Sequence, residues 1–322
     1  MWRCSAKDAW LAGLSLAHAC ALFCSAYAWP HVSIGWKLGI VPMLALLTTY
    51  SIVIVAHLFT HNPWFRHPRL NAAASVLNSV TIGQSMQAYH VSHVRNHHRY
   101  HNDRPGPNGP PRDLSSTYAG ASDGTHLSIW RYAFAGAVAT LRNEAWLRLT
   151  AFVPALAAAD SARSPDQVVG ARLRDGERRQ MRLELIVLTL VLLGLLAVRP
   201  SFVLFAYLPS FFAALVLVNV QNYFEHFGAC PENRFANSVS HYGRLYNFVT
   251  FNDGYHQEHH LCPQEHWSCM EDVRRRYGAA LADNRHVVSP VPAILGFLDR
   301  RRNRIDRVPR DAAPARPRGK SA

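Results

Sequence analysis

Four long apolar segments constrain the fold of this chain more than any other feature. A helix needs about 20 predominantly apolar residues to cross a hydrocarbon core of about 30 Å. The segments cover residues 9–28, 38–59, 183–198 and 202–220. Pro30 and Pro200 lie in the short turns between the members of each pair. The sequence therefore predicts an all-α integral membrane protein with four transmembrane helices arranged as two hairpins and a cytoplasmic helical cap.

The net charge of +13 has a topological explanation. The chain lacks helix-turn-helix, zinc-finger and RNA-binding aromatic signatures, so we expect no nucleic-acid partner. The predicted hairpin turns carry only Lys37 and Arg199, whereas arginines accumulate on the opposite side. By the positive-inside rule, both termini and the large loop are expected in the cytoplasm, with the protein in the inner or plasma membrane.

Two weaker segments and the C-terminus complete the organisation. Residues 71–89 are moderately apolar, and residues 132–159 are interrupted by charges such as Glu144. Because charges at mid-span are costly, we expect the second segment to be an interfacial amphipathic helix and the first a re-entrant or interfacial helix. Residues 1–299 then form one membrane-embedded domain, and residues 300–322 form a disordered basic tail.

The six cysteines provide neither a disulfide framework nor a convincing metal site. They include no CxxC pair. Cys262, His266 and Cys269 supply three ligands where a tetrahedral zinc site needs four. We therefore expect isolated, reduced thiols.

The histidines are concentrated in four groups, each at or just beyond the end of an apolar segment. These are His57 and His61 in "HLFTH", His93, His97 and His98 in "HVRNHH", His226 in "NYFEHFG", and His256, His259 and His260 in "FNDGYHQEHH". A spacing of four puts His57 and His61 on one helical face. Adjacent His97 and His98 diverge by about 100° and should serve different ions or different edges of a binuclear site, with His93 joining one of them.

Nine imidazoles are too many for one ion and suit two. Imidazole binds Zn, Cu, Fe and Ni alike, so the donor type alone does not select the metal. Because all four groups must meet in one layer, residues 71–89 should not cross the membrane. Asn222, one turn before His226, is expected to hold a bridging water or orient the ring. His90 and His101 are expected outside the ligand set or at the surface.

The motifs "HLFTH", "HVRNHH" and "HQEHH", in this order and separated by a hydrophobic hairpin, resemble the histidine boxes of the membrane-bound fatty acid desaturase and hydroxylase superfamily. The third box is similar to that of sphingolipid and acyl-lipid desaturases. "NYFEHFG" and the HxxxHH spacing are similar to membrane alkane hydroxylases. The resemblance implies two irons held by His57, His61, His93, His97, His98, His226, His256, His259 and His260, with Asn222 in a water-mediated role.

The resemblance also implies O2 as oxidant, a lipid or acyl-chain substrate and electrons from a separate carrier. The chain has no HPGG haem-binding motif, so an external ferredoxin or rubredoxin type of donor is expected. The substrate should enter from the bilayer, with its polar head held by cytoplasmic arginines. The Pro- and Gly-rich run "HNDRPGPNGPPRD" is interpreted as a loop over the mouth of the site without a catalytic role.

Three functions fit this pattern to different degrees. A di-iron acyl-lipid desaturase leads, and a hydroxylase of alkyl or lipid chains, which is a monooxygenase, is the runner-up. A divalent metal transporter or sensor would place ionisable ligands near the bilayer midplane, whereas residues 183–198 and 202–220 carry almost none. The transporter is therefore the weakest of the three.

Overall fold

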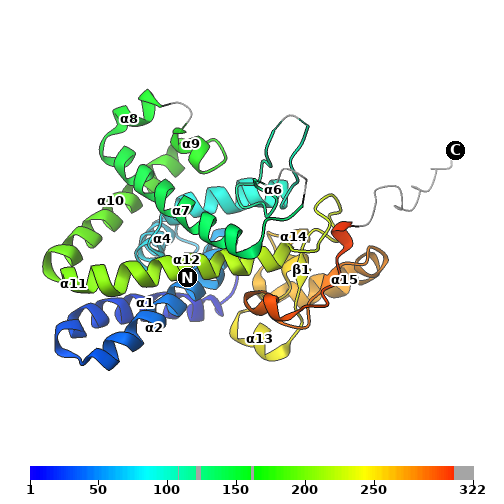
Figure 1. Cartoon of the computed structure of the whole chain (residues 1–322), viewed down its shortest axis with the longest axis horizontal. Helices are drawn as coiled ribbons and strands as arrows, with labels where there is room; N and C mark the ends of the chain where they lie inside the picture. The colour runs from blue at the N-terminus through cyan, green and yellow to red at the C-terminus, as the bar shows by residue number, and fades with distance from the viewer. Residues whose placement is uncertain (108, 121–124, 161–162, 308–322) are drawn as a thin grey trace.

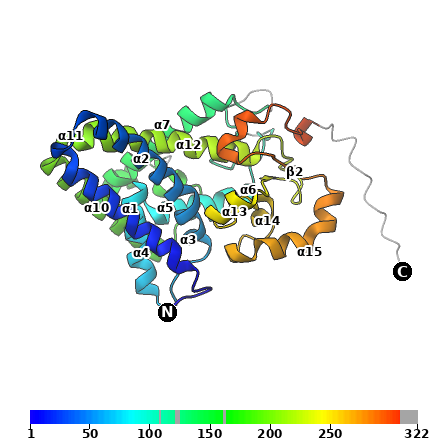
Figure 2. The same cartoon turned by 90° about the horizontal axis from the view of Figure 1, so that it is seen from below.

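The computed structural model describes residues 1–107, 109–120, 125–160 and 163–307. It is mostly helical, and it confirms the predicted all-α fold with four candidate membrane helices, whereas the cytoplasmic position of the cap stays a prediction. The helices that are long and apolar enough to cross a membrane, within the described residues, are Asp8–His31, Ile34–His61, Asp175–Val198 and Pro200–His226. In Figures 1 and 2 they lie side by side at one end of the molecule, with the shorter helices of the cap at the other end.

The first hairpin leads directly to the first pair of histidines. α1 (Asp8–Ala28) ends in a 3-10 turn that contains Pro30, and α2 (Ile34–Tyr50) follows it. The helix then continues through the π-helical segment η2 (Ser51–Ala56) into α3 (His57–His61). π-Helical turns inside longer helices are rare and frequently occur at functional sites.

The second hairpin brings a further histidine to the same end. It consists of α10 (Asp175–Val198), α11 (Pro200–Phe202), the π-helical η5 (Val203–Tyr207) and α12 (Leu208–His226). Pro200 is the first residue of α11, where a backbone N–H would have no partner within the helix, so proline loses no hydrogen bond there. Phe211 and Leu215 of α12 join Ile52 and Ile54 in one buried cluster, so the two hairpins share a core.

The segment predicted not to cross is broken in the middle. α4 (Pro68–Ile82) stops at Gly83, which has a positive φ of 70°, and α5 (Met86–His90) follows. A Cβ on Gly83 would lie 2.7 Å from the Phe211 ring, so the position requires glycine for space as well as for conformation. Neither piece is among the helices that could span the membrane.

The long helix α7 (Ile129–Phe152) packs along α12. Trp130, Phe134 and Val138, spaced by four, are exposed on its outer face, while Ala133 and Ala137 are buried. An outward apolar stripe fits the interfacial helix expected from the sequence, although its position relative to the bilayer stays a prediction. The helix begins three residues before the predicted start, and Pro154 opens the separate short helix α8 (Pro154–Ala159).

The cap assembles on the ends of α3 and α12. A two-residue parallel pairing of β1 with β2, Val239 opposite Val287, ties its parts together. The cap elements are η3 (Val91–His97), α6 (His98–Tyr100), β1 (Val239–Ser240), α13 (Arg244–Val249), α14 (His256–Leu261), η6 (Trp267–Cys269), α15 (Met270–Asp283), β2 (Val287–Val288), η7 (Ala293–Leu298) and η8 (Ile305–Arg307). The short helix α9 (Pro165–Val168) lies beside α8 and contacts α7 (Figure 1).

The C-terminal segment and the cysteines complete the cap. Residues 308–322 of the predicted tail lie outside the described residues. Residues 300–307 are bound to the cap, because Arg302 Nη1 donates to the Phe224 carbonyl at 2.7 Å and the Ile305 N–H donates to Gly228 at 2.9 Å. The folded part thus extends past the predicted boundary at residue 300. All six cysteines are free thiols, and His266 pairs with Asp8 at 3.0 Å.

Candidate metal centre

The cap and the spanning helices bring all nine predicted histidines together in two buried groups. Within each group, the candidate ligand atoms lie within 4.8 Å of one another. The first group, called here the five-histidine group, contains His57, His61, His93, His98 and His259, and the second, the four-histidine group, contains His97, His226, His256 and His260. Segments as far apart in sequence as α3 and α14 therefore meet at one place.

The five-histidine group has the nitrogen spacing of a coordination shell. His259 Nε2 lies 3.0 Å from His57 Nε2 and 3.0 Å from His98 Nε2, and His93 Nε2 lies 3.1 Å from His98 Nε2. Ligands about 2.0–2.1 Å from one ion are separated by about 2.8–3.4 Å, depending on whether the angle between them is octahedral or tetrahedral. The His61 ring lies 4.4 Å from that of His259 between centroids. These positions fit a bound cation.

A π-helical turn decides which histidines belong together. In a regular α-helix His93 would share a face with His97, four residues on. η3 covers Val91–His97, and in a π-helix the neighbouring turn is reached after five residues. His93 consequently joins His98 in the five-histidine group, and His97 faces the other group. The predicted divergence of His97 and His98 is what the structure shows.

The four-histidine group is equally compact. Its ring centroids are 4.9 Å apart for His97 and His226, 5.0 Å for His226 and His260, and 4.6 Å for His256 and His260. Nε2 of His226, Nε2 of His260 and both ring nitrogens of His256 are buried without a hydrogen-bond partner among the described residues. An unsatisfied buried polar group costs about 1–3 kcal/mol. A metal ion would satisfy several of them at once.

His90 and His101 lie at the edge of the two groups. His101 Nδ1 is 3.1 Å from His260 Nδ1, and these two residues form a third, overlapping set with His98. His90 belongs to neither group, since its Nδ1 bonds the Thr60 carbonyl at 3.1 Å. The ring centroids of His98 and His260 are 4.6 Å apart, so the two main groups adjoin each other.

Burial favours the neutral form of five candidate ligands, which is the form that binds metals. Desolvation lowers the pKa of His93, His98, His256, His259 and His260 well below the usual value near 6.5, and the neighbouring imidazoles lower it further. A histidine must be unprotonated at the ligating nitrogen to coordinate a metal. The pocket therefore prepares these rings for an ion near neutral pH.

The loop after the second histidine motif supplies a partner that sequence reasoning missed. His97 Nδ1 donates to Asp113 Oδ2 at 2.8 Å, and the same oxygen accepts the Asn102 N–H at 2.6 Å. Burial opposes ionisation of Asp113, but the neighbouring His97 and the Ser115 hydrogen bonds hold the pKa of this carboxyl below its usual value. The interpretation of this loop as a mere cover is thus incomplete, because it also orients a candidate ligand.

Replacing Asp113 with asparagine is expected to weaken metal binding about 10- to 100-fold, because partners of this kind fix the tautomer and orientation of the ligating ring. Metal titration of the purified protein with Zn²⁺ measures the change. Asp175→Asn, an exposed substitution of the same type at the start of α10, is the matched control. Equal affinities in the two variants would remove Asp113 from the site.

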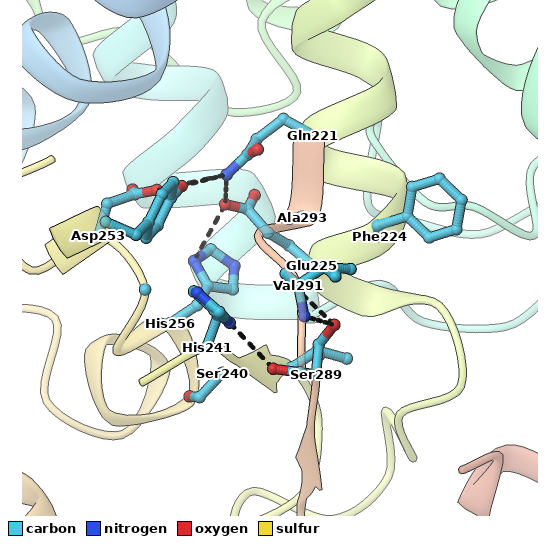
Figure 3. Close-up of a pocket in the computed structure, with 13 residues that line it drawn as sticks. Gln221, Phe224, Glu225, Ser240, His241, Asp253, His256, Ser289, Val291 and Ala293 are labelled. Atoms are coloured by element: carbon cyan, nitrogen blue, oxygen red, sulfur yellow. Dashed lines mark hydrogen bonds and ion pairs between the residues drawn. The ribbon is translucent and has the colours of Figure 1, made fainter. Parts of the chain in front are cut away.

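Two further carboxylates each face one histidine, and Figure 3 shows both carboxylates, Asp253 and Glu225, with Gln221 between them and His256 beside Glu225. Asp253 Oδ1 lies 3.6 Å from His57 Nδ1, and Glu225 Oε1 lies 3.7 Å from His256 Nδ1. Gln221 Nε2 donates to Glu225 at 2.7 Å and to Asp253 at 3.3 Å. A cavity of about 10 Å³ beside them approaches the size that holds one water. The Gln221 amide therefore links the two carboxylates that face the two histidine groups.

The side-chain amide of Asn222 donates hydrogen bonds to residues other than the nine histidines. Its Nδ2 donates to the Tyr132 hydroxyl at 2.5 Å and to the Ser115 carbonyl at 3.2 Å. Its expected water-mediated role stays a prediction.

A larger cavity of about 430 Å³ reaches both histidine groups. It runs between α7, α12 and the α5–η3 helix. The histidines in its wall are His57 and His93 of the five-histidine group and His97 and His256 of the four-histidine group. Most of the remaining wall is made of small and aliphatic residues such as Ala135, Ala139, Leu215 and Val218.

The comparison with known proteins agrees with this geometry. The model of the fatty acid desaturase family matches residues 34–292, a range that contains all nine histidines. No curated protein and no solved structure matches the chain. The match covers most of the chain and agrees with the four apolar helices and the two histidine groups. The chain therefore belongs to the fatty acid desaturase family, a family of metal-dependent oxidoreductases.

Proposed function

We propose that the protein is a membrane di-iron, O2-dependent acyl-lipid desaturase. The observation that carries this proposal is the cavity of about 430 Å³, whose wall contains histidines of both groups. A chain lying in it would present one stretch of methylene groups to both ions. A site for stored or transported metal has no need of such an apolar cavity.

The two histidine groups would each hold one iron. The irons would supply the activation of O2 needed to attack an unactivated C–H bond, which no side-chain acid or base can perform. The protein's own contribution is to hold neutral imidazoles at fixed positions, to fix His97 through Asp113, and to keep bulk water away from the buried site.

The overall reaction defines what must be delivered to the site. Desaturation removes two hydrogens from adjacent carbons while O2 is reduced to two waters, so two electrons and two protons must also arrive. We assign the electrons to an external ferredoxin or rubredoxin type of carrier. Hydroxylation of the same chain would consume the same electrons and protons but leave one oxygen atom in the product.

Product analysis tests the proposal. The protein is expressed in a lipid-producing host, and the lipids are profiled by mass spectrometry against a His97→Ala variant. Loss of two hydrogens from an acyl chain is the expected change. Gain of one oxygen would instead establish the hydroxylase, the alternative that "NYFEHFG" at the end of α12 favours. A lipid profile identical to that of the variant would contradict both.

Gly136 of α7 lies in the cavity wall where α7 and α12 come close together. Gly136 lines the cavity, and a Cβ built on it would overlap the Asn219 side chain of α12. Gly136→Leu is therefore expected to obstruct the path of the acyl chain and to lower turnover about 100-fold, the scale on which substrate misplacement acts. Metal content should stay at the wild-type level, because Gly136 belongs to neither histidine group.

Product formation and iron content are measured together for this variant. Gly194→Leu is the matched control, since Gly194 lies on the exposed side of α10 and a Cβ there meets nothing within 4 Å. Wild-type turnover in Gly136→Leu would show that the substrate takes another path.

A further inference from the structure

Near its end away from the histidines, the large cavity contains a few polar side chains among aliphatic ones. Along α7, the residues that line the cavity are 132, 135, 136, 139, 140, 143, 144 and 147, which form one helical face. At 1.5 Å per residue this face is about 22 Å long. Tyr132 marks one end, where its hydroxyl meets Asn222 close to His97. Asn143 and Glu144 lie near the other end, about one turn before Leu147, together with Gln84.

Glu144 has an oxygen that the fold leaves without a hydrogen bond. The residue is 6% exposed, and its Oε2 has no hydrogen-bond partner among the described residues. The nearest cation is Arg148, whose Nε lies 3.9 Å from this oxygen and whose Nη2 donates to the Gly83 carbonyl at 2.7 Å. Burial raises the pKa of Glu144 to about 7, although Arg148 and a hydrogen bond from Ser85 lower it in part.

A second buried carboxylate nearby shows what a structural role looks like. Glu184 is fully buried and accepts hydrogen bonds from Ser75 Oγ at 2.5 Å, Ser85 Oγ at 2.7 Å and the Gln87 N–H at 2.8 Å. It does not line the cavity. The Glu184 carboxylate thus stabilises the chain at the break between α4 and α5. Glu144 has fewer partners, namely the Ser85 N–H and the more distant Arg148, and its buried Oε2 accepts no hydrogen bond from the described residues, which is costly.

We propose that the Glu144 carboxylate accepts a hydrogen bond from a polar group of the substrate, namely a hydroxyl, an amide N–H or an amine, at the end of the cavity away from the histidines. This inference rests on the proposed function and specifies its substrate class. It differs from the expectation of an arginine-held head group, because the cavity wall described here contains no arginine or lysine. A bare carboxylate or phosphate would lie against the Glu144 carboxyl, and the wall supplies no arginine or lysine to pair with it.

The same geometry separates the recognised group from the reacting carbons. Glu144 lies twelve residues beyond Tyr132, which corresponds to about 18 Å along α7. The reacting carbons are therefore far from the polar group, well along an extended chain. Glu144 acts as a specificity residue, since it lies at the opposite end from the candidate ligands.

The test uses three probes that share one eighteen-carbon chain: 1-octadecanol, octadecylamine and octadecanoate. Binding to the purified full-length protein is measured by equilibrium competition after loading with Zn²⁺, which cannot activate O2, so the readout is independent of turnover. The wild type should bind the alcohol and the amine about tenfold or more tighter than octadecanoate, the scale of a hydrogen bond to a charged group. Glu144→Leu should abolish both preferences, and Glu144→Gln should abolish the preference for the amine.

Two comparisons keep the result unambiguous. Glu184→Gln should lower the melting temperature and leave the ratios among the three probes unchanged. Unchanged ratios in both Glu144 variants would overturn the inference, as would an equal loss of all three probes. Selective binding without any lipid product in the host would support the role of Glu144 while rejecting the proposed desaturase.

Discussion

Replacing His259 with alanine is expected to abolish turnover and to reduce bound iron from about two ions to about one per chain. His259 is central in the five-histidine group, since its Nε2 lies 3.0 Å from those of both His57 and His98. Even the loss of a residue that only supports a ligand costs 10- to 100-fold in affinity or activity. Losing a ligand should therefore lower product formation by more than about 100-fold.

The measurement combines elemental analysis of the purified protein with product formation in the lipid-producing host. His31→Ala is the control, because His31 is exposed in the turn between α1 and α2, at the opposite end of the spanning helices from His61. Full activity in the His259 variant would contradict the assignment of the five-histidine group. Loss of activity in both variants would point to a general effect of histidine removal on folding.

The spanning helices could be predicted from the sequence because their signal is local. A run of apolar residues and a proline at the turn are sufficient to predict a hairpin. The ends of these helices are less predictable. α10 begins at Asp175, eight residues before the predicted start at residue 183. The prediction missed these residues because the first two turns of the helix are polar. The Arg174 backbone N–H donates to the Glu177 side-chain carboxylate at 2.7 Å and so caps the start of the helix, a contact that a hydropathy pattern does not detect.

The candidate ligands could also be predicted, but their grouping could not. The histidine motifs mark the residues, whereas the pairing of His93 with His98 depends on a π-helical turn that leaves no periodic signal. The supporting carboxylates differ in the same way. Glu225 directly precedes His226 and is part of "NYFEHFG", so the motif itself could have indicated it as a partner. Asp113 is brought to His97 by the fold of a long loop, so sequence spacing contains no trace of the contact.

Replacing His226 with alanine is expected to empty the four-histidine group while the five-histidine group keeps its ion. His226 Nε2 is buried without a partner among the described residues, and its Nδ1 lies 3.2 Å from the Asn237 carbonyl, which orients the ring. Three imidazoles would remain, so the affinity should fall by more than the 10- to 100-fold that a supporting partner costs. Product formation should fall to background.

Asn222→Ala is the control for His226→Ala, because Asn222 lies one helical turn before His226 on α12. The Asn222 amide is bound to Tyr132 and Ser115, so its loss should leave about two irons per chain. Retention of both ions in the His226 variant would exclude that ring from the ligand set. If the His226 and His259 variants each retain one ion and neither forms product, a single ion is insufficient for the reaction. The two groups must then act together on the chain in the cavity that joins them.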